Sequence, residues 1–413
     1  MRYFNKFVGD RLNRLQEITD LQWNILGSHI HLIASACYPF ACVLQALSEP
    51  SSVLPAEGMP GARYLPGSRV MDIVEVEGEE LVLTTFGNPK GYRATLQPHS
   101  GTQANQIVFN AVLKHDDTVL CMTARDGGHI SHTVLIGRRN KTINFGLDAD
   151  GLIDYECLRN LALSTRPRLI IVGGSALPRQ IDFQICSEIA REAGAFLHAD
   201  ISHTATFIAA NAHISPFPHC DFLTFNTVKN LRGPNAGVLI YRDQFQRIVQ
   251  SSIFPTSQGG ANENSMLAKF ATFLEWQQRD IGQYAEVIVS QARIMASVFQ
   301  SEGIKLTTGG TDCHILLLEL ADKEKTGADF ERDLEDLGVL VNKNLIPDDK
   351  RAPAMTSGIR IGATNLAILN YEPDDTALLA RWIADSIHLN SASSDVIPHL
   401  VEKYHRKNAW RSL

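Results

Sequence analysis

Lys229 is the single amine in the stretch FNTVKNLRGPNAG (residues 225–237), where mostly small and polar residues surround it. Asp200 lies 29 positions earlier (229 − 200), near the end of the apolar run GAFLHADIS. A carboxylate that ends a buried strand needs a partner, because a lone buried charge is unfavourable. A protonated pyridine nitrogen is one such partner, and a lysine that forms a Schiff base is the second requirement of pyridoxal phosphate. The pair predicts a site for that cofactor; the alternatives are a solvated loop lysine and an aspartate in a cap or salt bridge.

A phosphate group would need backbone N–H donors and hydroxyls at the start of a helix. The stretch HSGTQANQIVFNAVL (residues 99–113) places Ser100, Gly101 and Thr102 at the start of an amphipathic segment, which suits an anion. His129 follows two glycines and could stack on the cofactor ring, and His203 could reach the phenolic oxygen of that ring. An ordinary helix cap and core histidines are the alternatives, but the order and spacing of these residues together favour the cofactor site.

Short apolar runs alternate with helical stretches from about residue 68 to 280, which predicts an α/β fold with a mainly parallel sheet covered on both faces. The last two runs lie close together in the sequence, so an antiparallel strand is expected there. Chemistry gathers at the carboxyl ends of such strands, where the candidate side chains are found. The runs expected to form strands are 118–124, 168–176, 194–202, 221–227 and 236–242, with a helix at 183–194.

The chain of 413 residues is 44% hydrophobic, enough for more than one domain. We expect a helical N-terminal arm (1–30), a large cofactor-binding domain (31–280) and a smaller α+β domain (281–413). A long helical stretch from about 267 should lead into the smaller domain, whose strands are expected at 314–320 and 338–344.

The composition also limits the function classes. A formal net charge of −7 disfavours nucleic acid and anionic membrane surfaces as partners. No apolar run is long enough to cross a bilayer, and the N-terminus lacks the pattern of a signal peptide. The seven cysteines are scattered and never form CxxC, which argues against a disulfide framework or a metal site. We therefore expect a cytoplasmic protein without a bound metal.

Twelve blocks in this order resemble serine hydroxymethyltransferase, over roughly residues 25–390. The resemblance implies a fold-type-I pyridoxal-phosphate transferase (aspartate-aminotransferase-like) with a seven-stranded sheet. It also implies an obligate homodimer, or a tetramer, whose active sites are built from both subunits. The blocks are YPFACVLQAL, PAEGMPGARY, LQPHSGTQAN, DGGHISH, GLIDYECL, PRLIIVGGSALPRQIDF, HADISHTATFIAANAHISPFPHCDF, TVKNLRGPNAG, FPTSQGG, TDCHILLLEL, LVNKNLIPDD and TSGIRIG.

The resemblance assigns a role to each matching cofactor residue. Lys229 resembles the Schiff-base lysine, Asp200 the partner of the pyridinium nitrogen, and His129 the histidine that stacks on the ring. His203 and Ser175 resemble the groups around the phenolic oxygen. The expected phosphate cup consists of Ser100, Gly101 and Thr102, with Gly259 and Gly260 from the other subunit.

The substrate residues follow in the same way. Arg360 in TSGIRIG resembles the arginine that binds the α-carboxylate, helped by Ser35, and a bidentate guanidinium suits that task. Glu57 in PAEGMPG matches the acid–base glutamate that the family donates across the dimer, and Tyr64 matches an active-site tyrosine. Asn344 retains one folate contact, so tetrahydrofolate remains a candidate co-substrate.

Several positions depart from the usual pattern of the family. Pro55 and Leu65 stand where two further active-site tyrosines are expected, and a lost phenol removes a proton shuttle. These losses indicate either drift or a pocket refitted for another amino acid, and refitting is favoured because the cofactor residues and Arg360 are intact. The other departures are Ala36, Cys37, Asp126, Asn226 and Val228.

The retained residues predict chemistry at the α-carbon of an amino acid through a Lys229 Schiff base and a quinonoid. The main hypothesis is retro-aldol, hydroxymethyl-transfer or transaldolase chemistry on a larger or non-standard amino acid, in specialised biosynthesis. Decarboxylation, which could be oxidative, or β-elimination of a modified amino acid is an alternative. The ordinary reaction of serine with tetrahydrofolate and a non-catalytic cofactor-binding relative are the others.

Overall fold

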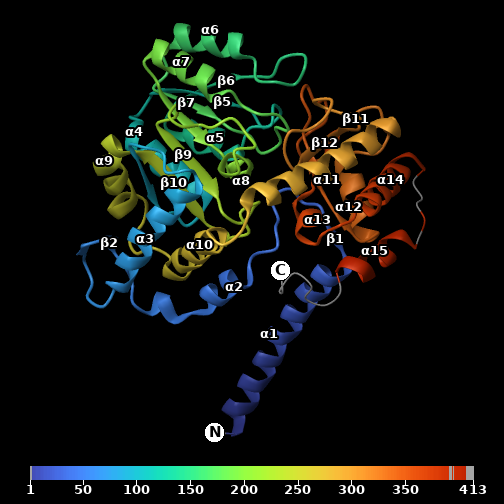
Figure 1. The fold of residues 1–413 in the computed structure, drawn as a ribbon, viewed down its shortest axis with the longest axis horizontal. Helices are drawn as coiled ribbons and strands as arrows, with labels where there is room; N and C mark the ends of the chain where they lie inside the picture. The colour runs from blue at the N-terminus through green and yellow to red at the C-terminus, as the bar shows by residue number, and fades with distance from the viewer. Residues whose placement is uncertain (1, 390–392, 394, 406–413) are drawn as a thin grey trace.

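The computed structural model describes residues 2–389, 393 and 395–405. Two lobes lie side by side, one built around the large sheet and one around α11–α15 (Figure 1). Helix α1 (Arg2–Ser28) projects away from both lobes. Within the described residues, no helix is long and apolar enough to cross a membrane, and no cluster of three or more potential metal ligands is found.

The large lobe holds a seven-stranded sheet in the order β4-β10-β9-β8-β7-β5-β6. Only β10 runs against its neighbours, because it pairs antiparallel with both β4 and β9. The mostly parallel α/β sheet and the antiparallel strand near its end are thus confirmed. The strands are β4 (Tyr92–Thr95), β5 (Thr118–Met122), β6 (Lys141–Phe145), β7 (Leu169–Val172), β8 (Phe196–Asp200), β9 (Phe222–Asn226) and β10 (Gly237–Arg242).

The second lobe holds a four-stranded antiparallel sheet in the order β11-β12-β15-β14. Its strands are β11 (Lys305–Leu306), β12 (Ile315–Glu319), β14 (Asn342–Asn344) and β15 (Gly358–Gly362). Strand β1 (Ile30–His31) pairs with β13 (Val339–Leu340), so the chain after α1 packs first against the C-terminal part. The predicted domain boundaries remain a prediction.

Helices cover the large sheet on both faces (Figure 1). Their ends are set by local chemistry: Asp182 caps α7 by accepting the N–H of Ile185, and Gly194 ends that helix with a left-handed φ of 72°. The helices of this lobe are α2 (Ala41–Ser48), α3 (Val70–Thr85), α4 (Gly101–Val112), α5 (Ile130–Val134), α6 (Tyr155–Thr165), α7 (Phe183–Ala193), α8 (Ala205–Ala209), α9 (Gln246–Ser251) and α10 (Glu263–Trp276).

The remaining elements complete the chain. The C-terminal helices are α11 (Ile281–Ser301), α12 (Gly327–Asp336), α13 (Thr364–Ile368), α14 (Pro373–Leu389) and α15 (Val396–Tyr404). A short hairpin joins β2 (Gly58–Met59) to β3 (Ala62–Arg63). Single helical turns lie at η1 (Pro50–Val53), η2 (Ile136–Arg138), η3 (Asp243–Phe245) and η4 (Ser252–Ser257).

Two expectations about the C-terminal part need correction. The stretch 338–344 is not one strand: β13 pairs with β1, whereas β14 pairs with β15 in the other sheet. The long helical stretch from about 267 is two helices, α10 and α11. Asp280 caps α11 by accepting the N–H of Gln283, so the second helix begins anew.

Lys269 of α10 is buried beneath the start of α4, with 1% of its surface exposed. Its Nζ donates to the carbonyl oxygens of Leu96, Pro98 (2.9 Å) and Gly237 (3.0 Å). The N–H of Gly237 donates in turn to Pro98 O at 3.2 Å. One buried amine, whose pKa burial lowers to about 7, therefore joins β10 to the segment that leads into α4.

Replacing Lys269 by methionine keeps the volume but leaves these buried carbonyls without their donor. We expect the variant to lose about 2 kcal/mol or more of unfolding free energy, because unpaired buried polar groups are costly. The drop in the urea midpoint measures the loss. Lys305→Met is the matched control: that side chain is 71% exposed in a surface ion pair and should matter by less than about 1 kcal/mol. Equal midpoints for the two variants would contradict the prediction.

Candidate active site

A pocket opens at the carboxyl ends of the parallel strands, where the sequence placed the reactive side chains. It brings together eight of the residues expected from the sequence or found to depart from the family, and adds four that were not predicted. Its lining consists of Gly101, Thr102, Asn105, His129, His132, Gly174, Ser175, Asp200, Ser202, His203, Asn226 and Lys229.

Asp200, at the end of β8, is held by three donors. His132 Nε2 and Asn105 Nδ2 lie 3.0 Å and 2.9 Å from Asp200 Oδ2, and the N–H of Ser202 lies 3.1 Å from Oδ1. Burial alone would raise the pKa of Asp200. The hydrogen bond and charge of His132, together with the charge of Lys229, outweigh burial and hold that pKa well below its ordinary value. The carboxylate is therefore ionised throughout the neutral range.

Two further buried hydrogen bonds hold Asn105, one of the donors to Asp200, in place. Thr224 on β9 donates to Asn105 Oδ1, and His198 Nε2 lies 2.8 Å from the Thr224 hydroxyl. Sequence reasoning missed Asn105 and His132. His132 carries a weak signal, since it lies one helical turn after His129 in GGHISH, whereas Asn105 looks like any polar residue of α4.

Lys229 follows β9 and reaches the same pocket. Burial lowers the pKa of Lys229 to about 8; the negative charge of Asp200 raises it and the positive charge of Arg360 lowers it further. An appreciable fraction of this amine is thus neutral near pH 7, in contrast to an ordinary lysine. A neutral amine is the form that attacks an aldehyde carbon.

The N-terminus of α4 forms the anion-binding side of the pocket. Ser100 caps the helix by accepting the N–H of Gln103 at 3.1 Å, while Gly101 and Thr102 line the pocket. A Cβ on Gly237 would lie only 2.2 Å from Ser100 O, so β10 approaches this turn as closely as a backbone can. The free N–H groups and the helix dipole favour a phosphate here.

His129 caps α5, its Nδ1 accepting the N–H of Ser131 at 3.2 Å. Burial lowers the pKa of His129 to about 4, so the ring is neutral at physiological pH. The neighbouring turn needs Gly173, which has φ 133° and whose Cβ would lie 2.1 Å from Asp200 O. This close contact places the 173–175 segment directly beside the end of β8.

Arg360 lies in the middle of β15 on the other lobe, and it contacts the lining residue Ser175 without lining the pocket itself. Its Nη1 donates to Ser175 O at 2.5 Å and its Nε donates to Asn342 Oδ1 at 3.1 Å. Burial lowers the pKa of Arg360 to about 10, and the guanidinium remains charged. Among the described residues, Nη2 has no hydrogen-bond partner, so this nitrogen is available to a ligand. Ser35 does not line the pocket; it adjoins Ala34, against which Gly362 of β15 packs.

Glu57, Tyr64, Gly259 and Gly260 do not line this pocket. They form a separate group, which we call the Glu57 cluster. Glu57 pairs with Gly260 in an antiparallel bridge, and the N–H of Tyr64 donates to Glu57 O at 3.1 Å. A Cβ on Gly259 would lie 3.6 Å from Glu57 Oε1. Residues that the sequence linked only through a family resemblance are thus neighbours in space.

Some departures from the family pattern lie at the pocket, and others lie at the Glu57 cluster. Asn226 lines the pocket and accepts the N–H of Val228 at 3.1 Å. Pro55 and Leu65 flank the Glu57 cluster; Pro55 Cβ would lie 3.7 Å from a Cβ on Gly260. The remaining three, Ala36, Cys37 and Asp126, lie outside the pocket lining, and Asp126 accepts from the hydroxyl of Thr123 at 2.6 Å.

The pocket fits pyridoxal phosphate on its own chemistry. It combines an amine of lowered pKa, an ionised buried carboxylate, a neutral histidine and a helix N-terminus. The absence of a side chain at Gly101 leaves space in the pocket, since a Cβ there would lie 3.3 Å from Asn226 Cβ. These groups match the aldehyde, the ring nitrogen, the ring face and the phosphate of the cofactor.

Comparisons with known proteins agree with this chemistry. The family model described as serine hydroxymethyltransferase matches residues 12–383. Serine hydroxymethyltransferase 1 of Ralstonia nicotianae is 38% identical over 360 residues, which cover 86% of each chain. The serine hydroxymethyltransferases of Ralstonia pickettii and Cupriavidus necator are 38% and 37% identical over the same share.

The lowered pKa of Lys229 can be tested in the cofactor-free protein. Competitive acetylation followed by mass spectrometry should give this amine a midpoint near pH 8, against about 10.4 for a lysine in water. Asp200→Asn should lower the midpoint further, because the lost negative charge stabilised the ammonium form. A midpoint at or above that of a solvated lysine would contradict the burial of the amine.

Proposed function

The chain belongs to the serine hydroxymethyltransferase family of pyridoxal-phosphate-dependent transferases, and we propose that it transfers the hydroxymethyl group of serine to tetrahydrofolate and leaves glycine. Enzymes of this family use both pyridoxal phosphate and tetrahydrofolate. The observation that carries the proposal is a single pocket in which Lys229 and Asp200 lie beside the N-terminus of α4.

The hypothesis of a non-standard amino acid receives no support from the comparisons. Relatives that match 86% of the chain carry the name of the ordinary enzyme, so the ordinary reaction fits better. A larger β-hydroxy amino acid remains a second candidate substrate on one observation: Pro55 and Leu65 flank the Glu57 cluster, which takes part in the proposed site. Cytoplasmic location remains a prediction.

The residues of the pocket divide the work of holding the cofactor. When bound, pyridoxal phosphate accepts the electrons of a bond that breaks at the α-carbon of an amino acid. Asp200 would hold a proton on the ring nitrogen, and His132 with Asn105 would keep the carboxylate in place. Lys229 would hold the aldehyde carbon, and the start of α4 would bind the phosphate.

Arg360 would bind the amino acid through its carboxylate. Its Nε and Nη1 are already fixed by Asn342 and Ser175, which orients the free Nη2 without further loss of side-chain entropy. The carboxylate position then selects which bond at the α-carbon lies perpendicular to the ring. Ser35 would assist from the segment that packs on β15.

Glu57 would supply acid–base catalysis to the pocket of a second subunit. The Glu57 cluster lies outside the pocket of its own chain, so a pocket that lacks a partner also lacks this carboxylate. We propose a homodimer in which Glu57, Tyr64, Gly259 and Gly260 complete the neighbouring site.

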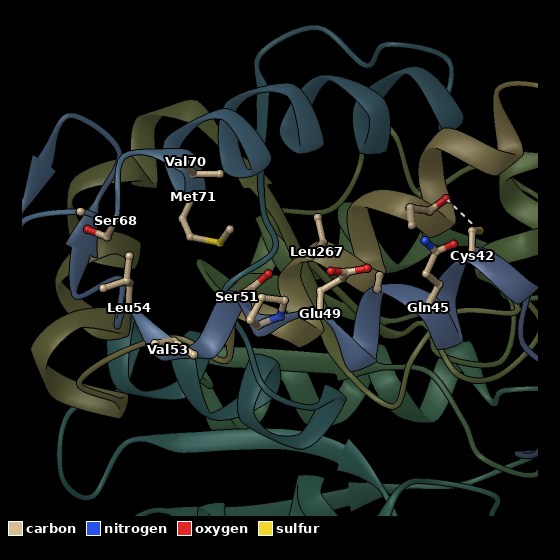
Figure 2. A pocket seen from close by; sticks show the side chains of 14 residues that line it. Cys42, Gln45, Glu49, Ser51, Val53, Leu54, Ser68, Val70, Met71 and Leu267 are labelled. Carbon is tan, nitrogen blue, oxygen red and sulfur yellow. Dashed lines mark hydrogen bonds between the residues drawn. The ribbon is translucent and has the colours of Figure 1, made fainter.

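An apolar groove next to the Glu57 cluster supports a second copy of the chain as the partner. Leu54, Met71 and Leu267 surround the groove between α2, η1 and α3 (Figure 2). Large apolar side chains stay exposed along this region, among them Val53 at 72% and Val70 at 63%. The groove is continuous in sequence with Glu57, so a subunit seated here would lie beside the residues that the proposal shares.

The reaction is tested by the visible spectrum of the purified holoprotein with glycine. We expect a long-wavelength absorption band that grows when tetrahydrofolate is added, together with serine cleavage that Lys229→Ala reduces by more than about 10³-fold. A yellow protein whose spectrum responds to neither compound would contradict the proposal. Cleavage of bulkier β-hydroxy amino acids would then support the second candidate.

The shared site is tested by mixing two inactive variants. A dimer of one Lys229→Ala chain and one Glu57→Gln chain has one intact site, so random pairing should restore about a quarter of the activity. Lys229→Ala mixed with Asp200→Asn is the control: these residues line the same pocket of one chain, and no activity should return. Absence of rescue in the first mixture would overturn the shared site.

A further inference from the structure

His203 depends on partners that no motif points to. We propose that Asn230, acting through His314, holds His203 in the tautomer whose Nε2–H donor faces the pocket. The proposal rests on the proposed function, since the acceptor for that donor would be the ring oxygen of pyridoxal phosphate. Asn230 and His314 are positioning residues in this proposal, because neither lines the pocket.

The orientation of the Asn230 amide is fixed by a backbone carbonyl, a group that can only accept. Its Nδ2 lies 2.9 Å from His203 O, which can only accept. Its Oδ1 lies 2.7 Å from the hydroxyl of Thr364, which donates in this orientation. The reverse orientation would place two oxygen acceptors against each other, at a cost that a site with 3% exposure cannot offset with water.

This orientation determines the tautomer of His314. Asn230 Nδ2 also lies 3.1 Å from His314 Nδ1, and an amide nitrogen only donates. His314 Nδ1 is therefore a bare acceptor, and the proton of the neutral ring lies on Nε2. Burial lowers the pKa of His314 to about 3, so the ring is neutral. Its Nε2–H lies 3.1 Å from Ala34 O, a second acceptor that agrees with the same tautomer.

The same Nε2–H meets His203. The two nitrogens, His314 Nε2 and His203 Nδ1, are 3.3 Å apart. The ring planes differ by 14° and the centroids are 5.4 Å apart, so the rings meet edge to edge in nearly one plane. A proton on His203 Nδ1 would collide with the His314 proton. His203 Nδ1 must accept, and its own proton lies on Nε2.

The charges around His203 keep this tautomer neutral. Burial lowers the pKa of His203 well below its ordinary value, and the charges of Lys229 and Arg360 lower it further. Among the described residues, His203 Nε2 has no hydrogen-bond partner. A neutral ring with Nε2–H exposed to the pocket donates one hydrogen bond and accepts no proton, which suits an anionic ring oxygen. Because Asn230 adjoins Lys229, one loop positions both the Lys229 amine and the residue that orients the His203 donor.

The tautomer can be measured without the cofactor. In protein labelled with [15N]histidine, with His203 assigned by His203→Gln, NMR should show a bare Nδ1 and a protonated Nε2 for both His203 and His314. The cofactor-free chain and the holoprotein should give the same result. A protonated Nδ1 on His203 would overturn the proposal whether or not the protein binds pyridoxal phosphate.

Asn230→Asp replaces the donor by an acceptor of the same shape. The proton of His314 should move to Nδ1 and that of His203 should follow, which removes the donor from the pocket. We expect affinity for pyridoxal phosphate to fall about 10-fold to 100-fold, the value of one hydrogen bond to a charged group. Asn235→Asp is the matched control: it adds the same charge to an exposed position of the same loop and keeps the acceptor for Asn226. It should change neither tautomer nor affinity.

Asn230→Ala provides a second variant if the aspartate prevents folding. It removes the donor without adding an acceptor, so His203 should become a mixture of tautomers and affinity should fall less than in Asn230→Asp. If the tautomer of His203 were unchanged in the variants, Asn230 would have a merely structural role and the proposal would fail. If wild-type protein shows the expected tautomers but binds no pyridoxal phosphate, the role of Asn230 and His314 in setting the tautomer of His203 stands, and the proposed function fails.

Discussion

The rest of the site depends on one buried carboxylate. Asp200 ends a central strand of the sheet, where a charge without partners would be strongly unfavourable. Its three donors come from α4, from α5 and from the chain just after β8. Satisfying this single charge therefore fixes two helices relative to the strand end. Because Thr224 and His198 hold Asn105 from below, the arrangement does not need a ligand to keep its shape.

The charge balance of the pocket also indicates what it is built to receive. The positive charge of Lys229 acts on Asp200, and the charges of Lys229 and Arg360 both lower the pKa of His203. An excess of positive charge in a largely buried site is unfavourable until an anion enters. A phosphate at the start of α4 and a substrate carboxylate at Arg360 would supply that negative charge. Burial is the main reason that the pKa of Lys229 is lowered, and the charge of Arg360 lowers it further.

How well each strand could be predicted from the sequence depends on how deeply it is buried. The five predicted strands of the large sheet are continuous apolar runs because the sheet is covered on both faces. The two strands that were missed, β4 and β6, are its edges, and in β6 exposed or half-buried positions precede the buried Phe145. The stretch 338–344 read as one strand because its apolar residues are contiguous, yet pairing divides it between two sheets. The main residues of the site could be found from their types and order. His132, Asn105 and Asn230 could not, since their importance lies in contacts across the fold.

Two of the departures, Pro55 and Leu65, lie apart from the pocket that would hold the cofactor. Lys229, Asp200 and His129, which would hold the cofactor, meet in one pocket, so a change of reaction type finds no support there. Pro55 and Leu65 instead flank the Glu57 cluster, in the segment proposed to reach the neighbouring subunit. Residues from another subunit can change without disturbing the hydrogen bonds of Asp200, because no hydrogen bond among the described residues joins Asp200 to the Glu57 cluster. Selectivity for the amino acid side chain could therefore vary while Lys229 and Asp200 stay in place, and variation at Pro55 and Leu65 is compatible with the ordinary reaction of the family.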